Sequence, residues 1–103
     1  MEDITMTLNP VLDGTILNLT IEGRLDTNTA PQLEALFADY KEITEANLDF
    51  SELEYISSAG LRVLLSEQKY LNSVNGKMTL KNVNETIMEV FEVTGFVDIL
   101  TIL

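Results

Sequence analysis

Hydrophobic and polar residues alternate along the first part of the chain in the pattern that is typical of β-strands. From Ile4 to Leu8 every second side chain is apolar, and a second run of alternating residues follows from Thr15 to Ile21. The dipeptide Asp13-Gly14 lies between the two runs and favours a tight turn. The pattern predicts two strands that are joined as an opening β-hairpin.

Three later segments show the spacing of apolar residues that is typical of amphipathic helices. The first begins at residues 29–32 (Thr-Ala-Pro-Gln), where a capping residue, an early proline and a glutamine form a capping-box pattern. The second begins near Ser57-Ser58, and the third is expected to be capped by Asn84 and to stop at Gly95. The apolar positions expected to face the core are Leu33, Leu36, Phe37, Tyr40, Leu61, Leu64, Leu65, Ile87, Val90 and Phe91.

Short apolar runs between these helices predict the remaining strands. They are Ala46–Phe50, then Met78–Leu80 after a turn at Asn75-Gly76, and finally Val97–Leu103. The expected order is β-β-α-β-α-β-α-β. Strands that alternate with helices imply an α/β fold, with a mixed sheet that is mostly parallel after the hairpin and helices packed against it. The chain has 103 residues and shows no linker or internal repeat, so one domain over residues 1–103 is expected.

Composition removes several classes of function. The chain contains neither His nor Cys, which excludes an imidazole base, a thiol nucleophile, a disulfide framework and a zinc site with such ligands. The glycines form neither a dinucleotide-binding nor a phosphate-binding loop, and no pair of acidic residues stands out by its spacing. The chain is therefore expected to be no enzyme and to hold no metal or cofactor.

The charge balance is strongly acidic. Six Lys and Arg residues stand against 17 Asp and Glu residues, which gives a formal net charge of −11. This charge argues against binding nucleic acid or an anionic membrane surface and favours a basic partner protein, unless it only keeps the domain in solution. No apolar stretch approaches the ~20 residues of a membrane span, and the acidic N-terminus is unlike a signal peptide, so a cytoplasmic protein is expected.

The most informative segment, residues 48–65, runs from a strand through a polar loop into a helix that starts at two adjacent serines. A serine at a helix start ordinarily caps the helix. The same position suits a phosphoryl group, because free backbone N–H groups and the positive end of the helix dipole attract an anion. Ala59 and Gly60 are small, which favours either access of another protein to the hydroxyl or close packing of helix on sheet.

Four blocks of sequence, taken together, point to a known family. Gly23–Asp26 is followed by Thr29-Ala30, Asp49–Ser51 ends the predicted third strand, Ile56–Leu61 begins the second helix, and Gly95-Phe96 follows the third. With this order and spacing, the chain resembles the STAS domain, and specifically the bacterial anti-sigma factor antagonists, also called anti-anti-sigma factors. The resemblance covers nearly the whole chain, and the family's order of elements agrees with the order predicted above.

This resemblance implies a protein-interaction switch in which an anti-sigma factor with serine kinase activity phosphorylates Ser58. The unphosphorylated domain binds the anti-sigma factor and frees the sigma factor, the phosphorylated form dissociates, and a serine phosphatase restores it. Ser57 stands where the family often has Asp, so Ser57 is an alternative acceptor. The alternative function is a non-phosphorylated STAS module, a scaffold in a signalling complex or beside a transporter.

The residues around the acceptor have expected supporting roles. Asp26 matches the family's Asp near the acceptor loop, where it either positions the site or serves as a turn carboxylate. Arg62 lies one turn after Ser58 and either neutralises a phosphate or is solvated. Glu52 and Glu54 precede the serines, which favours attraction of a basic partner. The expected partner-binding residues are Asp26, Ser57, Ser58, Ala59, Gly60 and Arg62.

Overall fold

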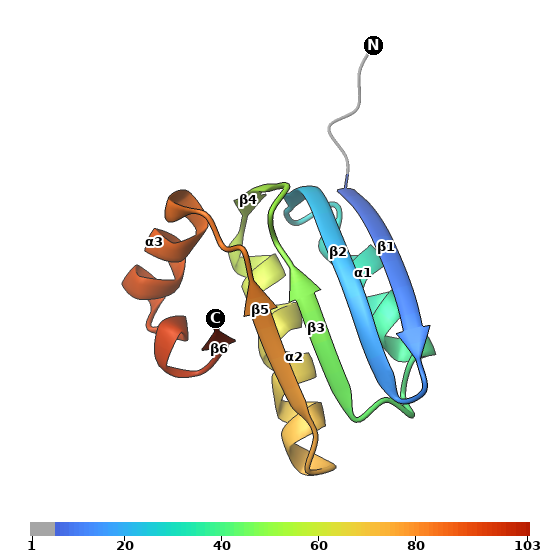
Figure 1. Ribbon diagram of the computed structural model, residues 1–103. Coiled ribbons are helices and arrows are strands. Elements are labelled where there is room, and N and C mark those ends of the chain that lie inside the picture. The colour runs from blue at the N-terminus through green and yellow to red at the C-terminus, as the bar shows by residue number, and fades with distance from the viewer. Residues whose placement is uncertain (1–5) are drawn as a thin grey trace.

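A mixed sheet of six strands forms the centre of the structure, and three α-helices pack around it (Figure 1). The computed structural model describes residues 6–103, so Ile4 of the predicted first strand lies outside the described residues. The elements in chain order are β1 (Met6–Asp13), β2 (Ile16–Leu25), α1 (Ala30–Asp39), β3 (Glu45–Asp49), β4 (Leu53–Ile56), α2 (Ser58–Ser73), β5 (Lys77–Lys81), α3 (Glu85–Thr94), the 3₁₀ turn η1 (Phe96–Asp98) and β6 (Thr101–Ile102). The predicted α/β class, with its opening hairpin and its alternation of helices and strands, is confirmed.

The strands β1-β2-β3-β5-β6 follow one another across the sheet, and β4 pairs separately with β2. Only β1 and β2 are antiparallel, and all the other pairs are parallel. The ten-residue strand β2 has two neighbours on the same side. Its first half, residues 16–20, pairs with β3, and its end, residues 23–25, pairs with β4. Strand β2 therefore connects the hairpin directly to the segment that leads into α2.

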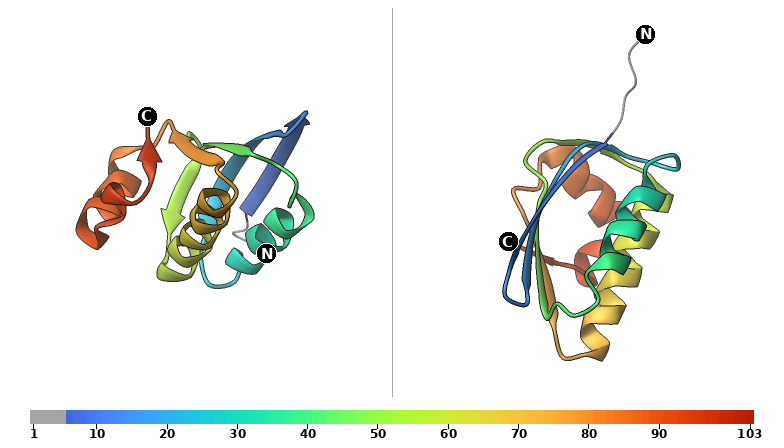
Figure 2. Two further views of the ribbon diagram at one scale, coloured as in Figure 1. Left: turned by 90° about the horizontal axis from the view of Figure 1, so that it is seen from below. Right: turned by 90° about the vertical axis from the view of Figure 1, so that its right-hand side faces the viewer.

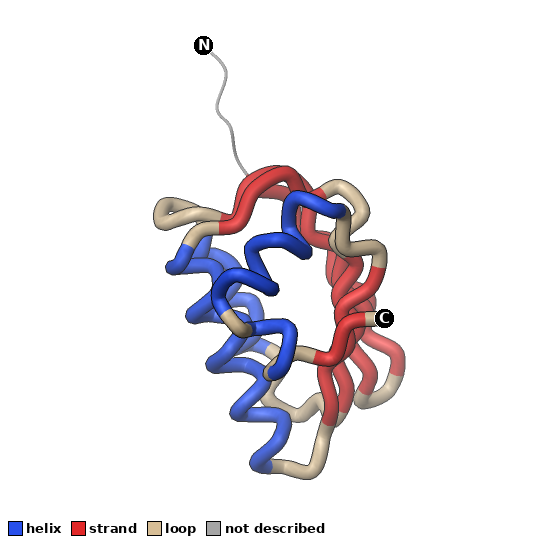
Figure 3. Tube along the Cα trace, turned by 90° about the vertical axis from the view of Figure 1, so that its left-hand side faces the viewer, coloured by secondary structure: helices blue, strands red, loops and turns tan. Residues whose placement is uncertain are grey.

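Helices α1 and α2 lie side by side on one face of the sheet, as the right-hand view of Figure 2 shows. Helix α3 packs against β4, and η1 turns the chain back to β6 at the edge of the sheet (Figure 3). In the part of the chain that the structure describes, no helix covers the other face of the sheet. That face carries a row of polar side chains, in which Asn47 donates to Asn18 over 3.1 Å and accepts from Thr79 over 2.6 Å.

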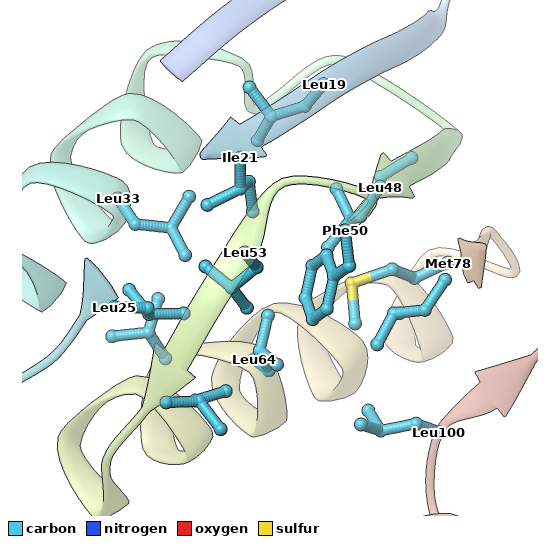
Figure 4. Close-up of a cluster of buried hydrophobic side chains, with 14 of the residues drawn as sticks. Leu19, Ile21, Leu25, Leu33, Leu48, Phe50, Leu53, Leu64, Met78 and Leu100 are labelled. Atoms are coloured by element: carbon cyan, nitrogen blue, oxygen red, sulfur yellow. The ribbon is translucent and has the colours of Figure 1, made fainter. Parts of the chain in front are cut away.

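The hydrophobic core fills the space between the sheet and the helices α1 and α2 (Figure 4). Fully buried side chains from both layers meet there, namely Leu19, Ile21, Leu25, Leu33, Leu48, Leu53, Leu64 and Met78. The Phe50 and Phe91 rings, with centroids 6.4 Å apart, join α3 to the same core. Each such side chain contributes about 1.5–3 kcal/mol through its removal from water. The start of α2 is thus anchored on a well-packed base.

Strand β4 corrects the predicted polar loop before α2. Only Leu53 and Ile56, at its two ends, are buried, while Glu54 and Tyr55 between them are exposed. This spacing lacks the alternation of period two by which a strand is recognised in a sequence. The strand forms because its backbone pairs with the end of β2, which is a tertiary contact.

The helix-end signals had mixed success. Asn84 caps α3 as predicted, with its side chain accepting from the Ile87 N–H at 2.9 Å, and Gly95 ends the helix with a φ of 83°. The predicted capping box at residues 29–32 is wrong, because the Thr29 side chain makes no cap hydrogen bond to α1. Its hydroxyl instead donates to the Arg24 carbonyl at 2.7 Å and closes the turn before the helix.

The last predicted strand, Val97–Leu103, is also too long. Residues 96–98 form η1, and only Thr101–Ile102 pairs with β5. The apolar content of this segment serves another purpose, since Leu100 is buried in the core.

Candidate functional site

The start of α2 is fixed to the sheet by a short chain of backbone contacts. Ile56, the last residue of β4, pairs with Leu25 at the end of β2. The next backbone N–H, that of Ser57, donates to the Leu25 carbonyl at 2.9 Å. Ser57 has extended backbone angles, and its hydroxyl accepts a hydrogen bond of 3.4 Å from the Gly60 N–H. The ends of β2 and β4 therefore determine where α2 begins.

The two serines differ in their surroundings. Ser57 is half-buried and is the N-cap, so its oxygen is already used within the helix. Ser58 is the first helical residue and is exposed, and within residues 6–103 no hydrogen bond involves its hydroxyl. The first turn of α2 carries no acidic residue. Ser58 thus presents a free hydroxyl beside backbone N–H groups and a helix dipole that both favour an anion.

Asp26 organises the turn between β2 and α1. Its Oδ1 accepts from the backbone N–H groups of Asn28 (3.0 Å) and Thr29 (3.1 Å), and its Oδ2 lies 3.5 Å from the Arg24 Nε. Burial raises the pKa of Asp26, but the hydrogen bonds from Thr29, Asn28 and Arg24 outweigh it and hold the pKa below its usual value. Asp26 is therefore a turn carboxylate, and it follows directly on Leu25, whose carbonyl holds Ser57.

Arg24 is a residue of this region to which the sequence analysis gave no role. Its guanidinium carbon lies 4.2 Å from the centre of the Tyr55 ring, and the same group pairs with Asp26. Arg24 and Tyr55 are opposite each other in the pairing of β2 with β4. No local pattern could reveal this contact, because it depends on the strand β4 that the sequence did not predict.

Gly60 and Ala59 have different environments. A Cβ atom on Gly60 would lie 2.6 Å from the Leu25 Cγ and 3.0 Å from the Ile56 Cγ1, so close packing of helix on sheet explains this glycine. Ala59 is half-buried, and together with the exposed Arg62 it lines a hollow of about 370 Å³ between α1 and α2. The assignment of these residues to a partner-binding surface stays a prediction.

Asp49 supports the loop between β3 and β4. Its Oδ1 accepts from the Asn82 side chain at 3.1 Å and from the Ser51 N–H at 2.9 Å. These two bonds, in that order, hold the pKa of Asp49 below its usual value. Glu52 and Glu54, in the loop and in β4, are exposed, so acidic side chains lie at the surface of the segment before the serines.

Two further searches concern the described part of the chain. Residues 6–103 contain no group of three or more acidic side chains arranged to hold a metal ion. No helix among them is long and apolar enough to cross a membrane.

Comparison with known families decides the relationship. The family model described as the STAS domain matches residues 8–103. The chain belongs to the STAS domain family. The residues singled out above, from Asp26 to Arg62, all lie within the matched part of this STAS domain.

Two relatives are named for the same regulatory role. This STAS domain is 39% identical over 90 residues to BtrV of Bordetella bronchiseptica, which bears the provisional name of an anti-sigma factor antagonist, and the alignment covers 85% of this chain and 77% of BtrV. It is 28% identical over 87 residues to the anti-sigma-B factor antagonist of Bacillus subtilis, covering 84% of this chain and 80% of that protein.

Solved structures of SpoIIAA share the fold of this STAS domain. The anti-sigma factor antagonist SpoIIAA in its unphosphorylated form superposes with a TM-score of 0.75 at 20% identity, covering 96% of this chain and 87% of that one. The phosphorylated form of the Bacillus SpoIIAA superposes with a TM-score of 0.74 at 20% identity, covering 96% and 91%. The same fold therefore fits both forms of that protein.

Proposed function

We propose that this STAS domain is an anti-sigma factor antagonist whose binding to an anti-sigma factor is ended by phosphorylation of Ser58. The partner is a protein with serine kinase activity in the cytoplasm, and a serine phosphatase restores the binding form. The domain is then the substrate of both enzymes and not itself a catalyst. Support comes from the shared name of the two relatives and from the geometry at the start of α2.

The observation that carries the proposal is the difference between the two serines. Ser57 uses its side chain to cap α2, whereas Ser58 is exposed at the first helical position. A kinase must reach the hydroxyl that it modifies, and the exposed one meets this requirement without unwinding the helix. Ser58 is therefore favoured over Ser57 as the acceptor.

A phosphoryl group on Ser58 would add roughly −1.5 to −2 charges and three acceptor oxygens. The start of α2 tolerates these because free N–H groups and the positive end of the helix dipole lie there. The fold is therefore retained, in agreement with the equal fit of both SpoIIAA forms. A partner that covers Ser58 would meet new bulk and new negative charge, and its affinity would fall.

Incubation with the cognate anti-sigma factor and Mg-ATP, followed by mass spectrometry, tests the acceptor. We expect one phosphate on Ser58, none in a Ser58→Ala variant, and phosphorylation of a Ser57→Ala variant. The Ser57→Ala control removes the cap at a cost of about 1 kcal/mol but leaves the exposed hydroxyl. Phosphate on Ser57, or a stable complex without any phosphate, would contradict the switch and favour the non-phosphorylated scaffold.

Isothermal titration calorimetry tests the effect on binding. We expect Ser58→Asp to weaken binding to the anti-sigma factor at least about tenfold, because a charge is buried without a partner in the interface. Ser58→Ala should bind like the parent chain. Equal affinities of the Asp and Ala variants would contradict the proposed effect of charge.

A further inference from the structure

A continuous groove runs between α1 and α2. The hollow of about 370 Å³ that begins at Ala59 adjoins a second one of about 190 Å³ farther along the helices. The two share Glu34, Val63 and Ser66 as walls, so they form a single depression, called here the α1–α2 groove. The parallel course of the two helices is visible in the right-hand view of Figure 2. The larger hollow has room for several water molecules, each of which takes about 30 Å³ in the liquid.

An acidic side chain without a partner lies in this groove. Glu67 lines the second hollow, and only 4% of its surface is exposed. Its Oε2 is buried, and within the described residues no hydrogen-bond donor reaches it. Burial raises the pKa of Glu67, and Lys41 only partly opposes this effect. A carboxylate in such a place lowers stability unless a cation or a donor pairs with it.

The basic residue beside the groove has a different partner. The Lys41 Nζ lies 4.4 Å from the centre of the Tyr70 ring, and the Tyr70 hydroxyl donates to the Lys41 carbonyl. The structure records no ion pair between Lys41 and Glu67 among residues 6–103. Lys41 thus attracts Glu67 from a distance without satisfying its oxygen.

We propose that the α1–α2 groove receives a basic side chain, an arginine or a lysine, from the protein that this STAS domain binds. Inside the groove this side chain pairs with Glu67, and the exposed Glu34 at the shared wall provides a second acidic contact. A cation there removes the penalty of the buried carboxylate, so the free energy of pairing adds to the affinity. Arginine suits this site best, since its planar group can donate two hydrogen bonds to one carboxylate.

Two features favour a protein as the source of this cation. The net charge of −11 attracts a basic partner surface over long range. The groove also begins at Ala59, next to Ser58 in α2, so a protein that covers the phosphorylation site reaches the groove as well. The inference rests on the proposed function for the identity of the partner, and on Glu67 and its surroundings for the chemistry of the site.

A probe titration followed by NMR tests the chemistry of the groove without any partner protein. Butylguanidinium should cause saturable shifts of amide signals in α1 and α2 around Glu67, and the uncharged butylurea should not. In Glu67→Gln the apparent affinity should fall at least about fivefold, and in Glu34→Gln, an exposed position that leaves the core intact, it should fall less. Glu89→Gln on α3 makes the same change in net charge away from the groove and should bind like the parent chain. An absence of saturable shifts, or equal affinity of Glu67→Gln and Glu89→Gln, would overturn the proposal.

Calorimetry with the cognate anti-sigma factor tests the source of the cation. Loss of one partner from a buried charge pair predicts about 10- to 100-fold weaker binding for Glu67→Gln, with no change for Glu89→Gln. Equal affinity of both variants would overturn the groove proposal while leaving the proposed function intact. Failure of the parent chain itself to bind would contradict the proposed function, and the probe titration would then alone support or overturn the cation site.

Discussion

Replacement of Gly60 by alanine tests whether close packing against β2 and β4 sets the position of the phosphorylation site. The new Cβ would lie 2.6 Å from the Leu25 Cγ, 3.0 Å from the Ile56 Cγ1 and 3.0 Å from the Leu25 carbonyl oxygen. Leu25 has no exposed surface, and its carbonyl already accepts from the Ser57 N–H. Neither group has room to withdraw, so α2 itself must move.

The magnitude follows from these distances. Carbon atoms in contact are about 3.5–4.0 Å apart, so the start of α2 must shift by roughly 1 Å. Overpacking of this kind costs about 1–3 kcal/mol. The better helix propensity of alanine returns about 0.5–1 kcal/mol. We therefore expect a net loss of about 1–2 kcal/mol, which in a domain of about 100 residues lowers the melting temperature by roughly 4–15 °C.

Thermal unfolding measures this loss, and NMR amide shifts of Ser57 and Ser58 report the displacement of the helix. Gly14→Ala is the matched control, because it adds the same methyl group where nothing lies within 4 Å and costs only the backbone strain at a φ of 65°. That strain is roughly 1–2 kcal/mol, so both variants lose similar stability. Only Gly60→Ala should move the serine signals and slow phosphorylation. Unchanged stability and unchanged serine signals in Gly60→Ala would refute the packing argument.

Four further substitutions test single contacts. Asn84→Ala should cost about 1–2 kcal/mol in urea unfolding, because it removes both the cap of α3 and a hydrogen bond of 2.9 Å to the Leu53 carbonyl. Asp49→Asn should cost about 1 kcal/mol at pH 7, and the difference should disappear as the pH falls below about 3.8, since the folded state lowers the pKa of Asp49. Glu67→Gln should have the opposite pH dependence: it stabilises by about 1 kcal/mol at pH 7, and the gain is lost towards pH 4.5, because the folded state raises this pKa. Ser57→Asp should raise stability by about 0.3–1 kcal/mol at low ionic strength, and a gain that persists in 1 M salt would contradict the dipole argument.

Local signals in the sequence were sufficient for much of the fold. The turn at Asp13-Gly14, the cap at Asn84 and the stop at Gly95 all depend on residues that are neighbours in sequence. Strand β4 does not, because its pairing partner at the end of β2 is about 30 residues away in the chain. The same distance explains the error at Thr29, whose hydroxyl is taken by the Arg24 carbonyl and is unavailable to the helix.

The site shows the same division. The start of α2 at the two serines was predictable from residue types, and so were the alternative interpretations of Gly60 and Asp26 as packing and turn residues. The choice between these interpretations needed coordinates, since a glycine in a sequence does not show what its missing Cβ would contact. The contact of Arg24 with Tyr55 and the unpartnered Glu67 arise entirely from tertiary packing.

The absence of an aspartate before the acceptor gains a physical meaning from the geometry. Ser57 makes the cap hydrogen bond that an aspartate would make, but it brings no charge to the start of α2. The nearby carboxylate of Asp26 is held by donors of its own turn and leaves the N–H groups of α2 free. A phosphoryl group on Ser58 would therefore be the first negative charge to reach this helix end, where it stabilises the fold. A partner that buries the same surface gains no such compensation, so a single phosphate shifts the balance towards the free domain.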